Sequence, residues 1–147
     1  MFISSSPKET QSFAASLAQK IVKALQERDR ALVICLRGEL GAGKTTFVQG
    51  FARGLGVTRS INSPTFLLVR QYPLPSSLPF STLYHIDAYR IANVKDVATL
   101  GLAEVFDNVR NIVLIEWPEN IASHIPSDAM MVEMGHGERE NQRIIYF

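Results

Sequence analysis

Residues 38–45 read Gly38-Glu39-Leu40-Gly41-Ala42-Gly43-Lys44-Thr45 and match the phosphate-binding pattern G-x-x-x-x-G-K-S/T. This pattern requires a strand before it and a helix after it. Residues 32–36 form a continuous apolar run, which is typical of a strand buried on both faces of a parallel sheet. From about residue 43 to 55, apolar side chains recur at helical spacing. The sequence therefore predicts a strand, a phosphate loop and a helix in succession.

Each part of this loop has a physical role in binding phosphate. Glycines allow a tight turn whose backbone N–H groups surround phosphate oxygens, and the start of the next helix adds partial positive charge. Lys44 places a positive charge at the β- and γ-phosphates, and the Thr45 hydroxyl can ligate Mg²⁺. We expect a nucleoside triphosphate with Mg²⁺ to be bound by residues Gly38, Glu39, Leu40, Gly41, Ala42, Gly43, Lys44, Thr45 and Thr46.

Regular elements are also predicted on both sides of this unit. Before it, apolar residues recur at helical spacing after Ser6-Pro7 to about residue 28. The elements expected after it are helical pieces in 94–106 broken at Gly101, a buried strand at 111–116, and strands near 129–134 and 143–147 around a turn at 135–137. The region after residue 116 is thus predicted to be short and formed of strands.

Residues 65–72 and 82–87 predict two further strands. The proline-rich connector 73–79 is too short for a crossover helix, so this pair is expected to form an antiparallel hairpin. The predicted fold class is α/β, a P-loop NTPase-like mixed and mainly parallel sheet with helices on both faces and one antiparallel hairpin. No internal repeat or composition boundary divides the chain, so residues 1–147 are expected to form a single domain.

Composition narrows the class of protein. The chain carries 15 basic and 14 acidic side chains, a formal charge of +1, so it has no overall field that would attract nucleic acid. Its single cysteine, Cys35, lies in the apolar run before the loop, which favours a buried structural residue and a reducing compartment. No signal segment and no apolar stretch of membrane-spanning length is found. We expect a cytoplasmic protein that does not contact a membrane.

Two acidic residues stand where predicted strands end, Asp87 and Glu116. Ligands of parallel α/β sheets bind outside the carboxyl ends of the strands, so both acids are expected near the phosphate loop. One would hold Mg²⁺ and the other would orient or deprotonate the attacking water, and spacing alone leaves the assignment open. The alternative is a structural role, in which each acid caps a helix or pairs with a basic residue such as Arg90.

Three further features have both a functional and a structural interpretation. A hydroxyl of Ser63-Pro64-Thr65 could sense a γ-phosphate, or the segment could be a plain turn. Trp117 could shield the site or form a contact surface, or it could belong to the core. His85 lies two residues before Asp87 and so on the same strand face. A hydrogen-bonded structural role is favoured for it over a catalytic one.

Four segments together resemble the TsaE family. They are 38–47 with the phosphate loop, Ser63-Pro64-Thr65, His85-Ile86-Asp87-Ala88-Tyr89-Arg90 and Glu116-Trp117-Pro118-Glu119. The resemblance covers nearly the whole chain, and the only departure inside a motif is Ala88, where a leucine is common. Members of this family are ATPases needed for the threonylcarbamoyl modification of the adenosine beside the anticodon of tRNA. They act with the TsaB and TsaD proteins.

The resemblance implies a role for each site residue. ATP phosphates would bind to the loop with Lys44 at the reacting phosphate, Thr45 and Glu116 would hold Mg²⁺, and Asp87 would serve hydrolysis. Thr10 falls where the family has a threonine near the nucleotide base. The family also has an arginine near its C-terminus, for which Arg139 is preferred here over Arg143.

The resulting hypothesis is an ATPase subunit that turns over slowly alone and depends on TsaB and TsaD. Direct tRNA binding by the isolated chain is not expected, because the charge is near neutral and no basic-aromatic surface motif is present. Two alternatives stay open, a small-molecule kinase and a nucleotide-sensing module without turnover. A GTPase is less favoured, because no Asn-Lys-x-Asp segment is present to read guanine.

Overall fold

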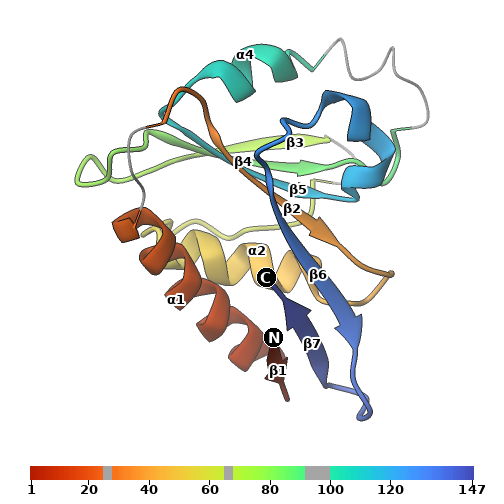
Figure 1. Ribbon diagram of the computed structural model, residues 1–147. Coiled ribbons are helices and arrows are strands. Elements are labelled where there is room, and N and C mark those ends of the chain that lie inside the picture. Colours follow the sequence, from red (N-terminus) through yellow and green to blue (C-terminus); the bar gives the residue numbers. More distant parts are fainter. Residues whose placement is uncertain (25–27, 65–67, 92–99) are drawn as a thin grey trace.

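A seven-stranded sheet forms the middle layer of this computed structural model (Figure 1). The structure describes residues 1–24, 28–64, 68–91 and 100–147. The strands lie in the order β1-β7-β6-β2-β5-β4-β3. They are β1 (Phe2–Ser4), β2 (Leu32–Arg37), β3 (Val69–Pro73), β4 (Thr82–Asp87), β5 (Asn111–Glu116), β6 (Met130–His136) and β7 (Arg143–Tyr146). Three pairs in the middle of the sheet are parallel: β6 with β2, β2 with β5, and β5 with β4. The outer pairs, β1 with β7, β7 with β6, and β4 with β3, are antiparallel. This mixed sheet confirms the predicted fold class.

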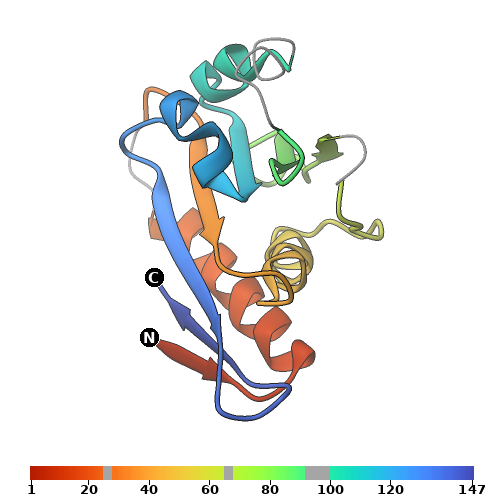
Figure 2. The same ribbon diagram turned by 90° about the vertical axis from the view of Figure 1, so that its right-hand side faces the viewer.

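Helices cover both faces of the sheet, as predicted (Figure 1). One face packs against α1 (Pro7–Ala24) and α2 (Lys44–Gly54). The other packs against α4 (Leu102–Asp107) and the 3₁₀ helix η1 (Pro118–His124). The view in Figure 2 shows the two chain ends side by side, because β1 pairs with β7.

The side chains of β2 alternate between the two cores. Leu32, Ile34 and Leu36 pack on the α1 and α2 side, and Val33 and Cys35 pack on the α4 and η1 side. All five are at most 1% exposed, which accounts for the continuous apolar run in the sequence. Burial raises the pKa of the Cys35 thiol to about 11, in agreement with its interpretation as a core residue.

The start of α1 follows from local chemistry. Pro7 is the first helical residue, where its missing N–H costs nothing. The Ser6 hydroxyl accepts a hydrogen bond of 3.2 Å from the backbone N–H of Glu9, and the Glu9 carboxylate accepts one of 2.7 Å from Ser5 N–H. These bonds satisfy free donors at the helix start, so the entry into α1 is fixed next to β1.

The hairpin prediction is confirmed for the described residues. β3 and β4 pair antiparallel, with Tyr72 opposite Leu83, and Leu74 N–H donates to the Ser81 carbonyl across the connector. Residues 65–67, at the start of the expected strand 65–72, and residues 94–99 of the expected helical segment 94–106 lie outside the described residues. The part of that segment after Gly101 forms α4.

Two local expectations are wrong, and one strand was not expected. β1 was not predicted, and it forms because Phe2 stacks on Phe13 of α1, with 4.3 Å between ring centroids, while its backbone pairs with β7. The region directly after Glu116 is η1 and not a strand, because Pro118 begins a helical turn there. The turn expected at 135–137 comes later, because β6 extends through His136 and pairs with Arg143.

Two glycines allow α2 to cross α1 at close range. A Cβ added at Gly50 would lie 2.7 Å from the carbonyl carbon of Gln11, and one added at Gly54 would lie 2.9 Å from that of Ala15. Both distances are shorter than real Cβ atoms make, so the two backbones could not keep this separation with larger residues. This crossing sets the position of α2 and hence of the loop at its start.

Gly50→Ala is therefore expected to destabilise the protein by roughly 1–3 kcal/mol through overpacking, although alanine alone would favour a helix by about 1 kcal/mol. Urea unfolding measures the change. Gly135→Ala is the matched control, because an added Cβ there meets nothing within 4 Å, and its effect is expected to stay within about 0.5 kcal/mol. Equal stabilities for the two variants would contradict the tight crossing.

Candidate functional site

Three neighbouring parallel strands end at one edge of the sheet, and the site lies there. In the register of the sheet, Leu36 of β2 is opposite Glu116 of β5, which is opposite Asp87 of β4. The glycine-rich loop follows β2 directly. A cleft of about 360 Å³ opens at this edge and is lined by Leu40, Gly41, Gly43, Lys44, Thr45, Thr46, Ser63, Asp87, Tyr89, Glu116 and Trp117. The expectation that both acids face the loop is confirmed.

Glycines give the loop its shape. Gly41 and Gly43 have φ angles of 77° and 93°, which side-chain-bearing residues rarely adopt. Gly38 also has a positive φ, and an added Cβ there would clash with the backbone of Met134 on β6. The loop is thus held against β6 at its start and turns sharply twice before α2. This is the form that lets backbone N–H groups surround an anion.

Lys44 lies in the mouth of the loop and is only 5% exposed. Its ammonium donates hydrogen bonds of 2.6 Å and 2.9 Å to the carbonyls of Gly38 and Glu39. The Nζ atom also lies 3.8 Å from the centre of the Trp117 ring, a cation–π contact. Burial lowers the pKa of Lys44, and the negative charges of nearby carboxylates, Glu116 foremost, oppose that shift. The carboxylates therefore offset only part of the cost of burying this positive charge, and a phosphate could serve as a further partner for the ammonium.

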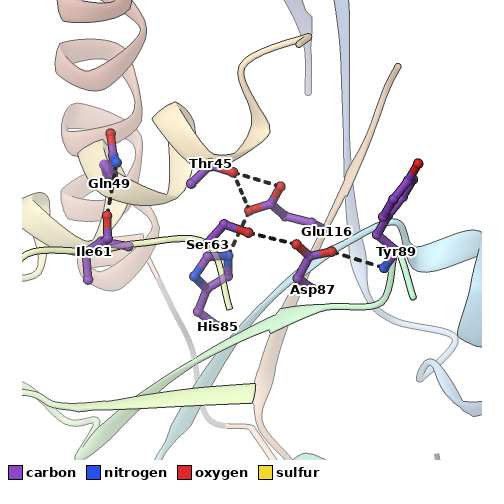
Figure 3. Close-up of polar contacts among 8 residues, drawn as sticks. All are labelled: Thr45, Gln49, Ile61, Ser63, His85, Asp87, Tyr89 and Glu116. Atoms are coloured by element: carbon purple, nitrogen blue, oxygen red, sulfur yellow. Dashed lines mark hydrogen bonds and ion pairs between the residues drawn. The ribbon is translucent and has the colours of Figure 1, made fainter. Parts of the chain in front are cut away.

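Thr45 and Glu116 are in direct contact (Figure 3). The Thr45 hydroxyl lies 3.0 Å and 3.1 Å from the two carboxylate oxygens of Glu116, to which it donates. Glu116 is 3% exposed, so its charge is held in a site with little water. On its other side, Oε1 of Glu116 lies 2.8 Å from Nε2 of His85, which is fully buried.

Asp87 is oriented from two sides in the same cleft (Figure 3). Its Oδ2 atom accepts a 2.8 Å hydrogen bond from the Ser63 hydroxyl, and Oδ1 accepts a 3.0 Å bond from the backbone N–H of Tyr89. Ser63 therefore belongs to the site, whereas Thr65 of the same motif lies outside the described residues. The side chain of Asp87 is fixed at the edge of the sheet next to Glu116.

Aromatic and apolar side chains form the rim of the cleft. The rings of Tyr89 and Trp117 lie 5.0 Å apart between centroids, and Tyr89 is 51% exposed. Leu40, on the loop side, is 76% exposed. Trp117 has a left-handed backbone, with φ of 59°, which turns its ring back over Lys44 at the end of β5. Trp117 covers Lys44 and also packs against the core on the α4 and η1 side, so the structure supports both a place at the site and a place at the edge of the core.

The residues in the cleft suit a magnesium ion bound together with phosphates. A threonine hydroxyl and a carboxylate are hard oxygen donors, and they meet beside the loop that would hold the phosphates. Within the described ranges, no group of three or more histidine, cysteine, aspartate or glutamate side chains could hold a metal by itself. That composition fits Mg²⁺, which usually keeps several waters and shares its protein site with substrate phosphates.

A smaller hollow of about 80 Å³ lies on the other side of the loop and is lined by Pro7, Thr10, Gly41, Gly43, Thr46, Asn141 and Arg143. Thr10 is 1% exposed, and its hydroxyl lies 2.6 Å from that of Ser4. The Arg143 guanidinium donates a 3.0 Å hydrogen bond to the carbonyl of Gly41. Arg139 is exposed in the turn between β6 and β7 and does not line this hollow.

The sequence did not predict the positions of two residues near the site, Arg143 and His85. Arg143 was the less preferred arginine, and only the extension of β6 through His136 brings it to the loop. His85 was expected to be structural, and it is buried and hydrogen-bonded, but its partner is the candidate metal ligand Glu116. The spacing of His85 and Asp87 on one strand face was the only sequence signal that could have indicated it.

Comparisons with known proteins agree on one family. The model of the family "Threonylcarbamoyl adenosine biosynthesis protein TsaE" matches residues 4–145. A Bacillus subtilis protein named tRNA threonylcarbamoyladenosine biosynthesis protein TsaE is 42% identical over 111 residues, which cover 74% of this chain and 66% of that protein. The Haemophilus influenzae protein of the same name is 32% identical over 124 residues, with 84% and 74% covered. The chain thus spans about two thirds to three quarters of these relatives.

A solved structure is also similar. The crystal structure of Bacillus subtilis YdiB matches with a TM-score of 0.72 and 30% sequence identity, covering 98% of this chain and 80% of that one. Among the described residues, no helix is long and apolar enough to cross a membrane.

The lowered pKa of Lys44 gives an expected pH dependence. Between that pKa and the ordinary value of 10.5, the unfolded chain binds more protons than the folded one, so the free energy of unfolding gains a contribution that rises with pH. Lys44→Met lacks this contribution. The difference in unfolding free energy, wild type minus variant, is expected to increase as the pH rises toward about 10.5 in urea titrations. Exposed Lys20 supplies the control, Lys20→Met, and a difference for Lys44→Met that does not change with pH would contradict the shift.

Proposed function

The chain belongs to the TsaE family, and on that premise we propose that it is an ATP-hydrolysing subunit for the threonylcarbamoyladenosine modification of tRNA, acting with TsaB and TsaD. Residues 1–147 would form one P-loop ATPase domain. The observation that carries this proposal is the convergence of Lys44, Thr45, Asp87 and Glu116 on one cleft beside a glycine-rich loop. Three different strand ends supply that constellation.

The loop and α2 would bind the phosphates. Backbone N–H groups of the loop and the N-terminus of α2 would surround the β-phosphate, and the Lys44 ammonium would leave its two carbonyl partners for phosphate oxygens. Thr45 and Glu116 would hold Mg²⁺, which when bound neutralises charge on the β- and γ-phosphates. Trp117, over Lys44, would limit access of water to that end of the cleft.

Asp87 is the residue we assign to the attacking water. Its two oxygens are already oriented by Ser63 and by the Tyr89 backbone, and its carboxylate lines the same cleft as Lys44. A carboxylate held in this way can accept a hydrogen bond from water and direct its lone pair toward the γ-phosphate. Glu116 is the less suitable candidate for that role, because both of its oxygens are in contact with Thr45.

The free energy of ATP hydrolysis would act through contacts with the partner proteins, and no phosphate would be transferred to a small-molecule acceptor. The near-neutral charge of +1 supports docking to proteins over direct binding of tRNA by this chain alone. We further propose that the protein works in the cytoplasm, where tRNA is modified and where its one cysteine, buried Cys35, stays reduced.

Phosphate release from ATP tests this function when it is measured for the purified chain alone and with TsaB and TsaD. We expect slow release alone and a clear stimulation by the pair, together with ATP-dependent association in a pull-down. Transfer of phosphate to a small acceptor would instead indicate a kinase. Association that depends on ATP without any release would indicate a nucleotide sensor, and either result would overturn the proposal.

Asp87→Asn and Glu116→Gln are each expected to lower the stimulated turnover by roughly 100-fold or more, because each removes a charge required at the reacting phosphate or metal. Nucleotide binding, measured by calorimetry without metal, is expected to change little, since the loop and Lys44 are intact. Glu104→Gln on α4 is the matched control, because Glu104 is exposed and does not line the cleft. A variant with full turnover would remove that acid from the mechanism.

Arginine variants distinguish the two candidates near the C-terminus. Arg143→Ala is expected to weaken nucleotide binding by roughly 5–20-fold, because it removes a charged hydrogen bond to the carbonyl of Gly41 in the loop. Arg139→Ala removes the same charge from the exposed turn and is expected to bind nearly as well as the wild type. Calorimetry with a non-hydrolysable ATP analogue provides the comparison. The reverse order of affinities would return the role to Arg139.

A further inference from the structure

His85 is a polar side chain in an apolar layer of the core. It lies on β4, is 0% exposed, and faces the same side of the sheet as Leu83, which belongs to the core under α1 and α2. Leu114 is its neighbour in register on β5. Burying an imidazole among leucines costs free energy unless the ring is hydrogen-bonded, and its partner is Oε1 of Glu116 at 2.8 Å (Figure 3).

The surroundings of the ring determine which nitrogen carries the proton. Nδ1 of His85 is buried and has no hydrogen-bond partner in the described part of the chain. A proton on Nδ1 would be a buried donor without an acceptor, which is more costly than an unused acceptor. The proton is therefore assigned to Nε2, which donates it to the Glu116 carboxylate. His85 thus donates from a fixed orientation.

Glu116 is thus held between two donors. Thr45 approaches its carboxylate from the cleft, and His85 approaches from the interior of the sheet. The Thr45 hydroxyl can ligate a metal ion through a lone pair and still donate its proton to Glu116, so on this side the carboxylate would be shared with the ion. The bond from His85 does not need to change, because His85 is not among the residues that line the cleft. His85 thus holds the carboxylate from the side that the ligand would not reach.

We propose that His85 is a positioning residue of the metal site, whose Nε2–H fixes Oε1 of Glu116 so that the carboxylate faces Thr45 and the cleft. This inference rests on the proposed function, in which Thr45 and Glu116 hold Mg²⁺. Groups that orient a metal ligand in this way fix its geometry and raise metal affinity, and their loss typically costs about 10–100-fold in metal affinity. His85 acts only through Glu116 and does not touch the nucleotide.

The test measures metal affinity directly, with Mn²⁺ as a probe for Mg²⁺ and with ADP present, by electron paramagnetic resonance. His85→Leu is expected to weaken Mn²⁺ binding by about 10–100-fold, whereas metal-free ADP affinity is expected to stay within about twofold. His85→Gln, whose amide can donate from nearly the position of Nε2, is expected to recover most of the loss. Equal metal affinity for His85→Leu and the wild type, or no recovery in His85→Gln, would overturn the proposal.

A second measurement on the unaltered protein does not depend on how the variants fold. Nitrogen chemical shifts of His85 in a long-range ¹H–¹⁵N spectrum report the tautomer, and the proton is expected on Nε2 both without ligand and with Mg²⁺ and ADP. A proton on Nδ1 alone would overturn the proposal. Failure of the proposed function looks different, because the wild type itself would then bind ADP without any dependence on metal.

Discussion

The parallel register of β2, β5 and β4 is the constraint on which the site depends. It places the end of β2, where the phosphate loop begins, beside Glu116 and Asp87 at one edge of the sheet. A shift of one residue in either pairing would turn an acid toward the opposite core, since successive side chains of a strand face opposite sides. The close crossing of α1 and α2 at Gly50 and Gly54 then sets where α2 lies, and with it Lys44 and Thr45.

Burial strengthens the electrostatic interactions of the charged groups at this edge of the sheet. Lys44, Asp87 and Glu116 are each 5% exposed or less, so their interactions are screened far less than those of surface groups. Each is held by hydrogen bonds of its own. Lys44 donates to loop carbonyls, Asp87 accepts from Ser63, and Glu116 is bonded to His85. The two acids are therefore oriented before any ligand arrives, which reduces the reorganisation needed when metal and phosphate bind, whereas Lys44 exchanges its carbonyl partners for phosphate oxygens.

Much of this could be predicted from sequence, because the deciding signals are local. The phosphate loop is a continuous pattern, and Asp87 and Glu116 stand directly at the ends of apolar strands. The contact between His85 and Glu116 could not be predicted in this way, since it joins residues 31 positions apart through the pairing of β4 with β5. The same holds for Arg143, whose place depends on how far β6 extends before the turn, and for β1, which is stabilised by pairing with β7 at the other end of the chain.

A crystal structure with Mg²⁺ and a non-hydrolysable ATP analogue tests the central claim most directly. We expect the phosphates inside the loop next to Lys44, and the metal ion ligated by the Thr45 hydroxyl and by Glu116, directly or through one water. Asp87 is expected to face the γ-phosphate across an ordered water. A nucleotide bound outside this cleft, or a metal ion with neither Thr45 nor Glu116 in its coordination sphere, would contradict the account.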